Sequence, residues 1–159
     1  VVVLTSPGGY PFCLVEWDGA ADPPAPVTLA PGGGASRADQ LCLDIPPDAY
    51  EPECAFWAGL TGWPMAQGSL PEFRSLHRPA GQPVRILLQR RFDAAAGDQV
   101  TGHVYLACDD RDALTAPHVQ AGAKVLARHP FWTTLADPAG RPYCLTPRDP
   151  RTGLPPSRP

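Results

Sequence analysis

The strongest constraint on the fold is a motif that occurs twice, once near the start of the chain and once near its end. Residues 2–15 read VVLTSPGGYPFCLV and residues 133–146 read TTLADPAGRPYCLT. Aligned without a gap, seven of the fourteen positions hold identical or closely similar residues. Each copy reads as two strands joined by a Pro-x-Gly turn, because proline presets φ and glycine accepts a positive φ. The repeat indicates a duplicated structural unit and predicts the same β-hairpin in both places.

Residues 36–150, which include the second copy, read as the element order β-α-β-β-β, repeated once. The segments QLCLD at 40–44 and HVYLA at 103–107 are both strand-like, and each is followed by turn residues and a helix-compatible stretch. Gly62 and Gly122 are suited to end the two helices, and Asp110 to cap the second. Pro117 lies inside that second helix and is expected to kink or shorten it. The predicted strands are 39–45, 64–69, 72–78, 83–91, 102–108, 123–127, 131–136 and 141–146, and the predicted helices are 48–61 and 110–120.

Charge and cysteine content narrow the classes of partner and compartment. The formal net charge of the 159 residues is -3, which gives no electrostatic reason to expect nucleic acid or an anionic membrane surface as a partner. No apolar run approaches the length of a membrane span, and no signal peptide is visible. The five cysteines, an odd number, do not suggest a disulfide framework. We therefore expect buried free thiols and a cytoplasmic location.

The element order, with Asp-Pro-Ala-Gly between the last two strands, resembles the glyoxalase-like branch of the vicinal oxygen chelate superfamily, which includes bleomycin resistance proteins and extradiol dioxygenases. The resemblance implies an α+β fold in which paired βαβββ modules form a cupped mixed sheet with helices on the outer face. It also implies a small molecule in the cup, often bound with a divalent metal. The segments that carry it are QLCLDI (40–45), AFWAGLTGW (55–63), HVYLACDD (103–110), GAKVL (122–126) and LADPAGRPYCL (135–145).

The resemblance also suggests how the chain is divided. Residues 36–150 are expected to form one glyoxalase-like domain, and residues 1–17 resemble the terminal hairpin of a preceding, mostly absent one. Residues 18–35 have the Pro, Gly and Ala content of a linker, and residues 151–159 that of a flexible tail. Because an isolated hairpin is not stable in water, residues 1–17 should pack along a sheet edge or against the same element of another chain. A homodimer is expected from the family.

The candidate site follows from the family pattern, in which each module supplies a His or Gln from its first strand and a Glu from its last. Carried over by motif, these positions are Gln40 and His103 on the first strands, with Gln89 and Cys144 on the last strands. None of the four is a carboxylate, which a hard divalent ion would favour. A softer ion such as Zn²⁺ could use His103 and Cys144. The alternative is structural: a hydrogen-bonded strand histidine, a small buried thiol and two glutamines in a polar cup.

Three functions remain open from the sequence. The first is a small-molecule-binding protein of the glyoxalase-like type without an essential metal, which the missing carboxylates favour. The second is a metal-assisted lyase, isomerase or dioxygenase, in which a divalent metal polarises an oxygen of the substrate. The third is a structural or regulatory half whose active partner lies in another domain or subunit. Whether the chain is an enzyme is not decided by its residues, since fold does not determine function.

Overall fold

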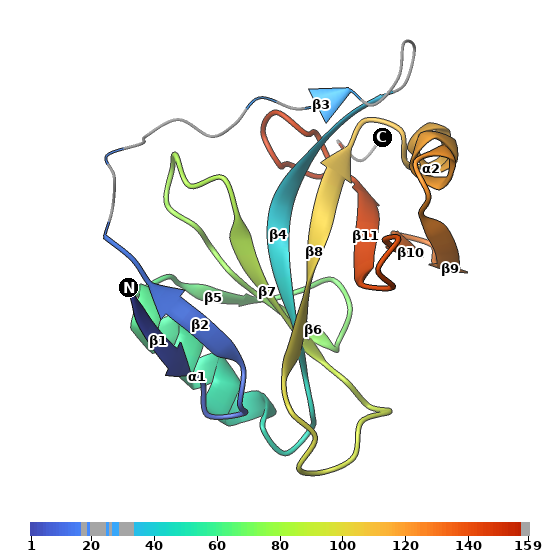
Figure 1. Ribbon diagram of the computed structural model, residues 1–159. Helices are drawn as coiled ribbons and strands as arrows, with labels where there is room; N and C mark the ends of the chain where they lie inside the picture. The colour runs from blue at the N-terminus through green and yellow to red at the C-terminus, as the bar shows by residue number, and fades with distance from the viewer. Residues whose placement is uncertain (17–18, 20–24, 26, 29–33, 157–159) are drawn as a thin grey trace. The chain divides into compact units, whose positions relative to one another are not determined.

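The computed structural model describes residues 1–16, 19, 25, 27–28 and 34–156, and its fold is mixed α+β as predicted. The chain divides into two compact units. Unit 1 comprises Val1–Pro23 and Leu41–Gly102, and unit 2 comprises Pro24–Gln40 and His103–Pro159. Strands β4 (Ala35–Ile45) and β8 (Thr101–Cys108) each contribute residues to both units. The elements follow the predicted order β-α-β-β-β twice, from β4 to the last strand (Figure 1).

In unit 1, three antiparallel strands and the end of β4 form a sheet with one helix packed on it. The strand order is β5 (Met65–Gln67), β6 (Phe73–Leu76), β7 (Arg85–Arg90), β4. Helix α1 (Tyr50–Thr61) ends at Gly62, whose φ of 67° allows its N–H to bond the Ala58 carbonyl. The helix and sheet enclose the core, which consists of Leu43, Ile45, Tyr50, Cys54, Trp57, Leu76, Leu88 and Val100.

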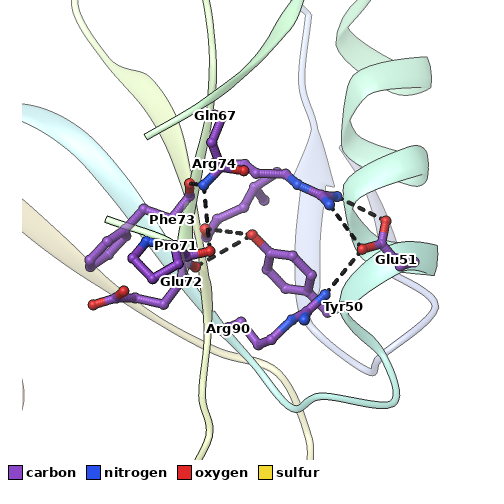
Figure 2. A network of polar contacts seen from close by, with 9 residues as sticks. Tyr50, Glu51, Gln67, Pro71, Glu72, Phe73, Arg74 and Arg90 are labelled. Carbon is purple, nitrogen blue, oxygen red and sulfur yellow. Dashed lines mark hydrogen bonds and ion pairs between the residues drawn. The ribbon is translucent and has the colours of Figure 1, made fainter. Parts of the chain in front are cut away.

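Tyr50 anchors the first turn of α1 to β6 and β7, as Figure 2 shows. Its ring lies against two guanidinium groups, 5.0 Å from Arg74 and 4.3 Å from Arg90, measured from Cζ to the ring centre. Burial raises the pKa of the Tyr50 hydroxyl to about 12, and the hydroxyl donates to backbone carbonyls of β7 and of the turn before β6 at 3.4 Å. Both guanidiniums also pair with Glu51. The one carboxylate compensates one of the two positive charges, and the contacts attach the first turn of α1 to β6 and β7.

The hairpin predicted for residues 1–17 is present as β1 (Val2–Thr5) and β2 (Pro11–Leu14), which form a separate two-stranded sheet. The hairpin packs on helix α1, and the Val100 N–H just before β8 donates to the Gly8 carbonyl at 2.9 Å. The expectation that it packs along a sheet edge or against the same element of another chain stays a prediction. The ring centre of Phe12 lies 5.0 Å from that of Trp57, and Tyr10 contacts the same indole edge-on. The exposed side of α1 thus supplies the apolar surface that an isolated hairpin lacks.

In unit 2, the first part of β4 and four further strands form a second sheet with the other helix. The order is β4, β8, β11 (Pro142–Pro147), β10 (Thr133–Ala136), β9 (Lys124–Arg128), and β3 (Val27–Thr28) pairs with β4. The Asp110 carboxylate caps helix α2 (Arg111–Gln120) as predicted. Pro117 does not end the helix, which continues for three further residues. The core consists of Cys108, Leu114, Ala123, Leu135 and Leu145.

The repeated motif adopts the same hairpin register in both copies. Val2 lies opposite Leu14 and Leu4 opposite Phe12, just as Thr133 lies opposite Leu145 and Leu135 opposite Tyr143. The prediction of one hairpin type in two places is confirmed. The surroundings differ, however, since β10 pairs with β9 and β11 with β8, whereas β1 and β2 pair only with each other within the described part of the chain.

Two sequence predictions concern segments at the borders of the described residues. Most of the predicted linker 18–35 lies outside them, and within it Val27–Thr28 pair with Ser36 and Ala35. Of the predicted tail 151–159, residues 157–159 lie outside them, whereas the Arg151 carbonyl accepts from Arg37 at 2.9 Å.

No helix among the described residues is long and apolar enough to cross a membrane. Four of the five cysteines are buried thiols as expected, but Cys13 is exposed.

His118 on α2 should make stability depend on pH. Its Nδ1 lies 2.8 Å from the Tyr143 hydroxyl, and its Nε2 is buried with no partner among the described residues. Burial lowers the pKa of His118 below the ordinary value of 6.5. The unfolded chain therefore binds a proton more readily, and the free energy of unfolding should fall as pH drops below about 6.5. In urea titrations, the free energy of unfolding should fall less between pH 7.5 and pH 5.5 for His118→Gln than for the unmodified protein. An equal fall in both proteins would contradict this.

Candidate functional site

The structure places three of the four predicted site residues in unit 2 and the fourth in unit 1. Gln40 is on β4, His103 on β8 and Cys144 on β11, all within unit 2, whereas Gln89 is on β7 of unit 1. Strands β4, β8 and β11 are neighbours in that order. That these residues share one ligand cup stays a prediction.

The unit 2 sheet has one face covered by helix α2 and one face turned away from it. On β8, Leu106 and Cys108 pack in the core with Leu114 of the helix, as do Tyr143 and Leu145 on β11. Because successive strand residues point to opposite faces, the alternate residues point away from the helix. This second face is here called the open face because α2 does not pack on it, although most of its side chains are buried. It carries His103, Tyr105 and Ala107 from β8, Cys144 and Thr146 from β11, and Thr134 from β10.

Polar and soft groups are concentrated on this open face. The ring centres of His103 and Tyr105 lie 5.1 Å apart, and the Cys144 Sγ lies 3.5 Å from the Thr134 Oγ1. Cys144 is level with Tyr105 in the parallel pairing of β11 and β8. His103 precedes Tyr105 by two residues on β8, so along the strands it lies roughly 7 Å from the level of Cys144. The open face thus offers an imidazole, a phenol, a thiol and a hydroxyl on three adjacent strands.

Gln40 is almost fully buried on β4, with 2% of its surface exposed. It alternates with Asp39, whose carboxylate is ion-paired with Arg148 at 3.0 Å, so Gln40 points to the opposite side of β4. A buried amide is retained only where its polar atoms find partners, because an unpaired one costs stability. Gln40 lies on β4, the strand next to β8, and its role in a ligand cup stays a prediction.

Gln89 lies on the face of the unit 1 sheet that points away from α1. Its neighbour Leu88 is in the α1 core, and the Gln89 Oε1 accepts from the Cys42 thiol at an Sγ–Oε1 distance of 3.7 Å. Strand alternation places Asp44 on the same side of β4 as Cys42. Sequence reasoning missed Cys42 and Asp44, because it took LCLDI only as the signature of a strand. It likewise missed Tyr105 and Thr134, which alternation with His103 and pairing with Cys144 could have indicated.

The four predicted residues do not fit a hard divalent metal. Gln40, Gln89, His103 and Cys144 provide two amides, an imidazole and a thiol, whereas Mg²⁺ or Mn²⁺ requires oxygen donors that compensate its charge. The Cys144 thiol already has a hydroxyl neighbour in Thr134. Of the four, His103 and Cys144 are the good Zn²⁺ ligands, fewer than the three protein ligands of a typical catalytic zinc. The four residues thus do not match the ligand set of a catalytic metal centre.

Comparison with known proteins identifies the family. The profile of the glyoxalase-like domain matches residues 40–146, which are 107 of the 159 residues. The chain belongs to the glyoxalase-like domain family. The family match covers both β-α-β-β-β halves from Gln40 on, and hairpin β1–β2 lies outside it. No curated protein matches the sequence of this glyoxalase-like chain.

Solved structures resemble the glyoxalase-like chain in fold only. The hypothetical protein BH1468 from Bacillus halodurans C-125 aligns with a TM-score of 0.54 and 11% identity, over 72% of this chain and 95% of that one. A glyoxalase I mutant from Zea mays aligns with a TM-score of 0.27 and 14% identity, over 69% of this chain and 45% of the maize chain. The alignment with the Bacillus protein supports the fold alone and, at 11% identity, transfers no site residue.

Proposed function

We propose that this glyoxalase-like chain binds a small organic molecule, without an essential metal, at the open face of the unit 2 sheet. The observation that carries the proposal is the row of polar side chains on β8, β11 and β10, opposite the face that packs on α2. An imidazole, a phenol, a thiol and a hydroxyl on adjacent strands give a ligand more polar contacts than a face of apolar residues would. Gln40 and Gln89 are proposed as further hydrogen-bonding residues, on the family pattern.

The side chains present favour one class of ligand. Tyr105 and His103 provide ring surface as well as a phenol and an imidazole, and Thr134 and Cys144 add a hydroxyl and a thiol. No charged side chain is among them. A neutral or weakly polar ring compound with oxygen substituents would fit such groups better than a phosphate or a polyanion. The net charge of -3 agrees with a small-molecule partner and gives no support for nucleic acid.

A metal-assisted lyase, isomerase or dioxygenase is the second candidate, and Cys42 and Asp44 favour it. They provide a thiol and a carboxylate on β4, and Gln89 contacts the thiol. A carboxylate is the donor type that the four residues carried over from the family lack. A metal bound by Cys42 and Asp44 would supply Lewis-acid chemistry on a substrate oxygen.

Metal content and ligand binding together test the two candidates. We expect protein purified without chelator to hold less than about 0.1 equivalent of zinc, iron, nickel or manganese by mass spectrometry. We also expect hits from a thermal-shift screen of oxygenated ring compounds to bind His103→Ala and Tyr105→Phe at least about tenfold more weakly, a loss of about 1.4 kcal/mol. The exposed His77 provides the control His77→Ala, which should bind like the unmodified protein.

Two results would overturn the first candidate. About one equivalent of metal that is lost in His103→Ala or Asp44→Asn, with folding unchanged, would favour the metal-assisted enzyme. Ligands whose affinity is unaffected by changes at His103 and Tyr105 would show that binding takes place elsewhere.

Cytoplasmic location is also proposed, since the five cysteines are free thiols.

A further inference from the structure

Two arginine side chains of unit 1 share a single carboxylate. Arg74 on β6 and Arg90 on β7 both pair with Glu51 in the first turn of α1. Figure 2 shows both guanidinium groups directed at this carboxylate, whereas the Glu72 side chain points away from them. Glu53, the other acidic residue of the helix, is fully buried and accepts hydrogen bonds from other donors. One of the two positive charges therefore remains without a negative partner.

The Glu51 carboxylate does not serve the two guanidinium groups equally. It pairs with Arg74 through both oxygens, at 2.8 Å from Nη1 and 3.0 Å from Nη2. Arg90 shares one of these oxygens, at 3.1 Å from its Nη2. The Arg90 Nε is buried and has no hydrogen-bond partner among the described residues. A carboxylate has two oxygens, so it completes the fork of one guanidinium and leaves the other incomplete.

The unpartnered Nε of Arg90 indicates an acceptor that Glu51 does not supply. A buried donor without an acceptor costs stability, so such donors are rare in folded proteins. A phosphate group has three oxygens that can accept at once, and it can pair with two guanidinium forks. A phosphate monoester also carries about 1.5 to 2 negative charges near neutral pH, which would compensate both arginines. Phosphate thus matches the donors and the charge of this cluster better than a carboxylate does.

Tyr50 holds both guanidinium groups in place. Their Cζ atoms lie 5.0 Å and 4.3 Å from the centre of its ring. Because groups held against a ring have already lost much of their rotational freedom, ordering them on a ligand costs little entropy. The side chains of Arg74 and Arg90 are 24% and 33% exposed, so an anion can reach them from solvent. Glu51 is 63% exposed, and an exposed ion pair contributes little stability, so its carboxylate can turn out to water.

We propose that Arg74 and Arg90 bind the phosphate group of a small soluble phosphate monoester, in the place that Glu51 otherwise occupies. The phosphate oxygens accept from Nη1 and Nη2 of Arg74 and from Nη2 and Nε of Arg90. Glu51 then turns to solvent, and it competes with the ligand for both arginines. Because of this competition, the dissociation constant for inorganic phosphate should be on the order of 1 mM. The inference is independent of the ligand site proposed in unit 2.

Titration of the 159-residue protein with inorganic phosphate and with phenyl phosphate, followed by NMR at constant ionic strength, tests the proposal. The resonance of the Arg90 Nε–H should shift with both compounds. Arg90→Lys keeps the charge but removes the fork, and it should weaken binding at least about tenfold. Glu51→Gln removes the competing carboxylate and should strengthen binding at least about fivefold. The control is Arg91→Lys, since Arg91 pairs with Asp93, and it should bind like the unmodified protein.

Acetate at the same ionic strength tests the preference for phosphate and should bind at least about fivefold more weakly. The proposal would be overturned if about 20 mM phosphate failed to shift the Arg90 Nε–H in both the unmodified protein and Glu51→Gln. Acetate that bound as tightly as phosphate would overturn it too, as would equal weakening by Arg90→Lys and Arg91→Lys. Cosedimentation with vesicles of phosphatidylcholine and phosphatidic acid that required Arg90, without binding of phenyl phosphate, would assign the site to a lipid headgroup instead.

Discussion

Replacing Glu53 with alanine should cost about 3–4 kcal/mol of unfolding free energy, because it leaves one buried and one partly buried donor without an acceptor. Glu53 lies on α1 and is fully buried. One carboxylate oxygen accepts from the Gly8 backbone N–H in the hairpin turn, and the other accepts from Trp57 Nε1 at 2.7 Å. The Gly8 carbonyl in turn accepts from the Val100 N–H at 2.9 Å. The turn of the hairpin is therefore attached to helix α1 through Glu53.

The same helix contains a matched control for this prediction. Glu51 is two residues earlier, and its side chain is 63% exposed although it pairs with Arg74 and Arg90. Exposed ion pairs contribute little, because water screens them and the side chains lose freedom in forming them. Glu51→Ala should therefore destabilise the protein much less than Glu53→Ala in urea unfolding followed by circular dichroism. Equal losses would show that Glu53 is not the attachment point of the hairpin.

Gly8 should be as sensitive as Glu53, for a steric reason. A Cβ at this position would lie 2.5 Å from the Val100 Cγ2 and 3.0 Å from the Glu53 Oε1. Close approach of the turn backbone to α1 therefore requires glycine here. This explains why the position is Gly8 in the first copy of the motif while the second copy has Ala139.

Replacing Arg148 with alanine should cost about 3 kcal/mol, since it removes the ion-pair partner of a fully buried carboxylate. Asp39 on β4 has no exposed side-chain surface, and its Oδ2 lies 3.0 Å from the Arg148 Nε. The Arg148 guanidinium also donates to the Gly153 carbonyl. One side chain thus connects β4 to the segment that follows β11, and its loss should also expose residues 148–154 to proteolysis.

Arg151→Ala is the control for Arg148→Ala. Arg151 pairs with Asp109 at 3.7 Å, but its side chain is 66% exposed. Its carbonyl, which accepts from Arg37, is unchanged by the substitution. We expect urea unfolding and limited proteolysis of Arg151→Ala to match those of the unmodified protein. If Arg148→Ala also matched it, the buried pair would contribute nothing to stability.

Much of the fold could be predicted from the sequence because it depends on local chemistry. The two predicted helices agree with α1 and α2 to within two residues, since Gly62 and Asp110 mark ends that need only neighbouring atoms. Strand β4 is longer than the predicted 39–45 and starts at Ala35. The extra residues pair with Val27–Thr28, and Ala35 exchanges hydrogen bonds with Asp109. Contacts so distant in sequence leave no local pattern.

The candidate site, like the fold, could be predicted from the sequence only in part. Gln40, Gln89, His103 and Cys144 could be chosen because a family motif names strand positions. The open-face neighbours Tyr105 and Thr134, and the contact between Cys42 and Gln89, depend on how separate strands align. That alignment is a result of pairing between segments far apart in the chain, for which single-sequence patterns carry little information.

The sequence by itself determined the element order, the repeated hairpin with its register, and the family, because turns, caps and alternation are encoded within a few residues. Only the tertiary structure decided that the first hairpin packs on α1 through Gly8 and Glu53, while its repeat is enclosed between β8 and β9. The two copies have nearly the same local chemistry. What differs is the surface available to bury them, and burial of apolar area depends on the whole fold rather than on the motif.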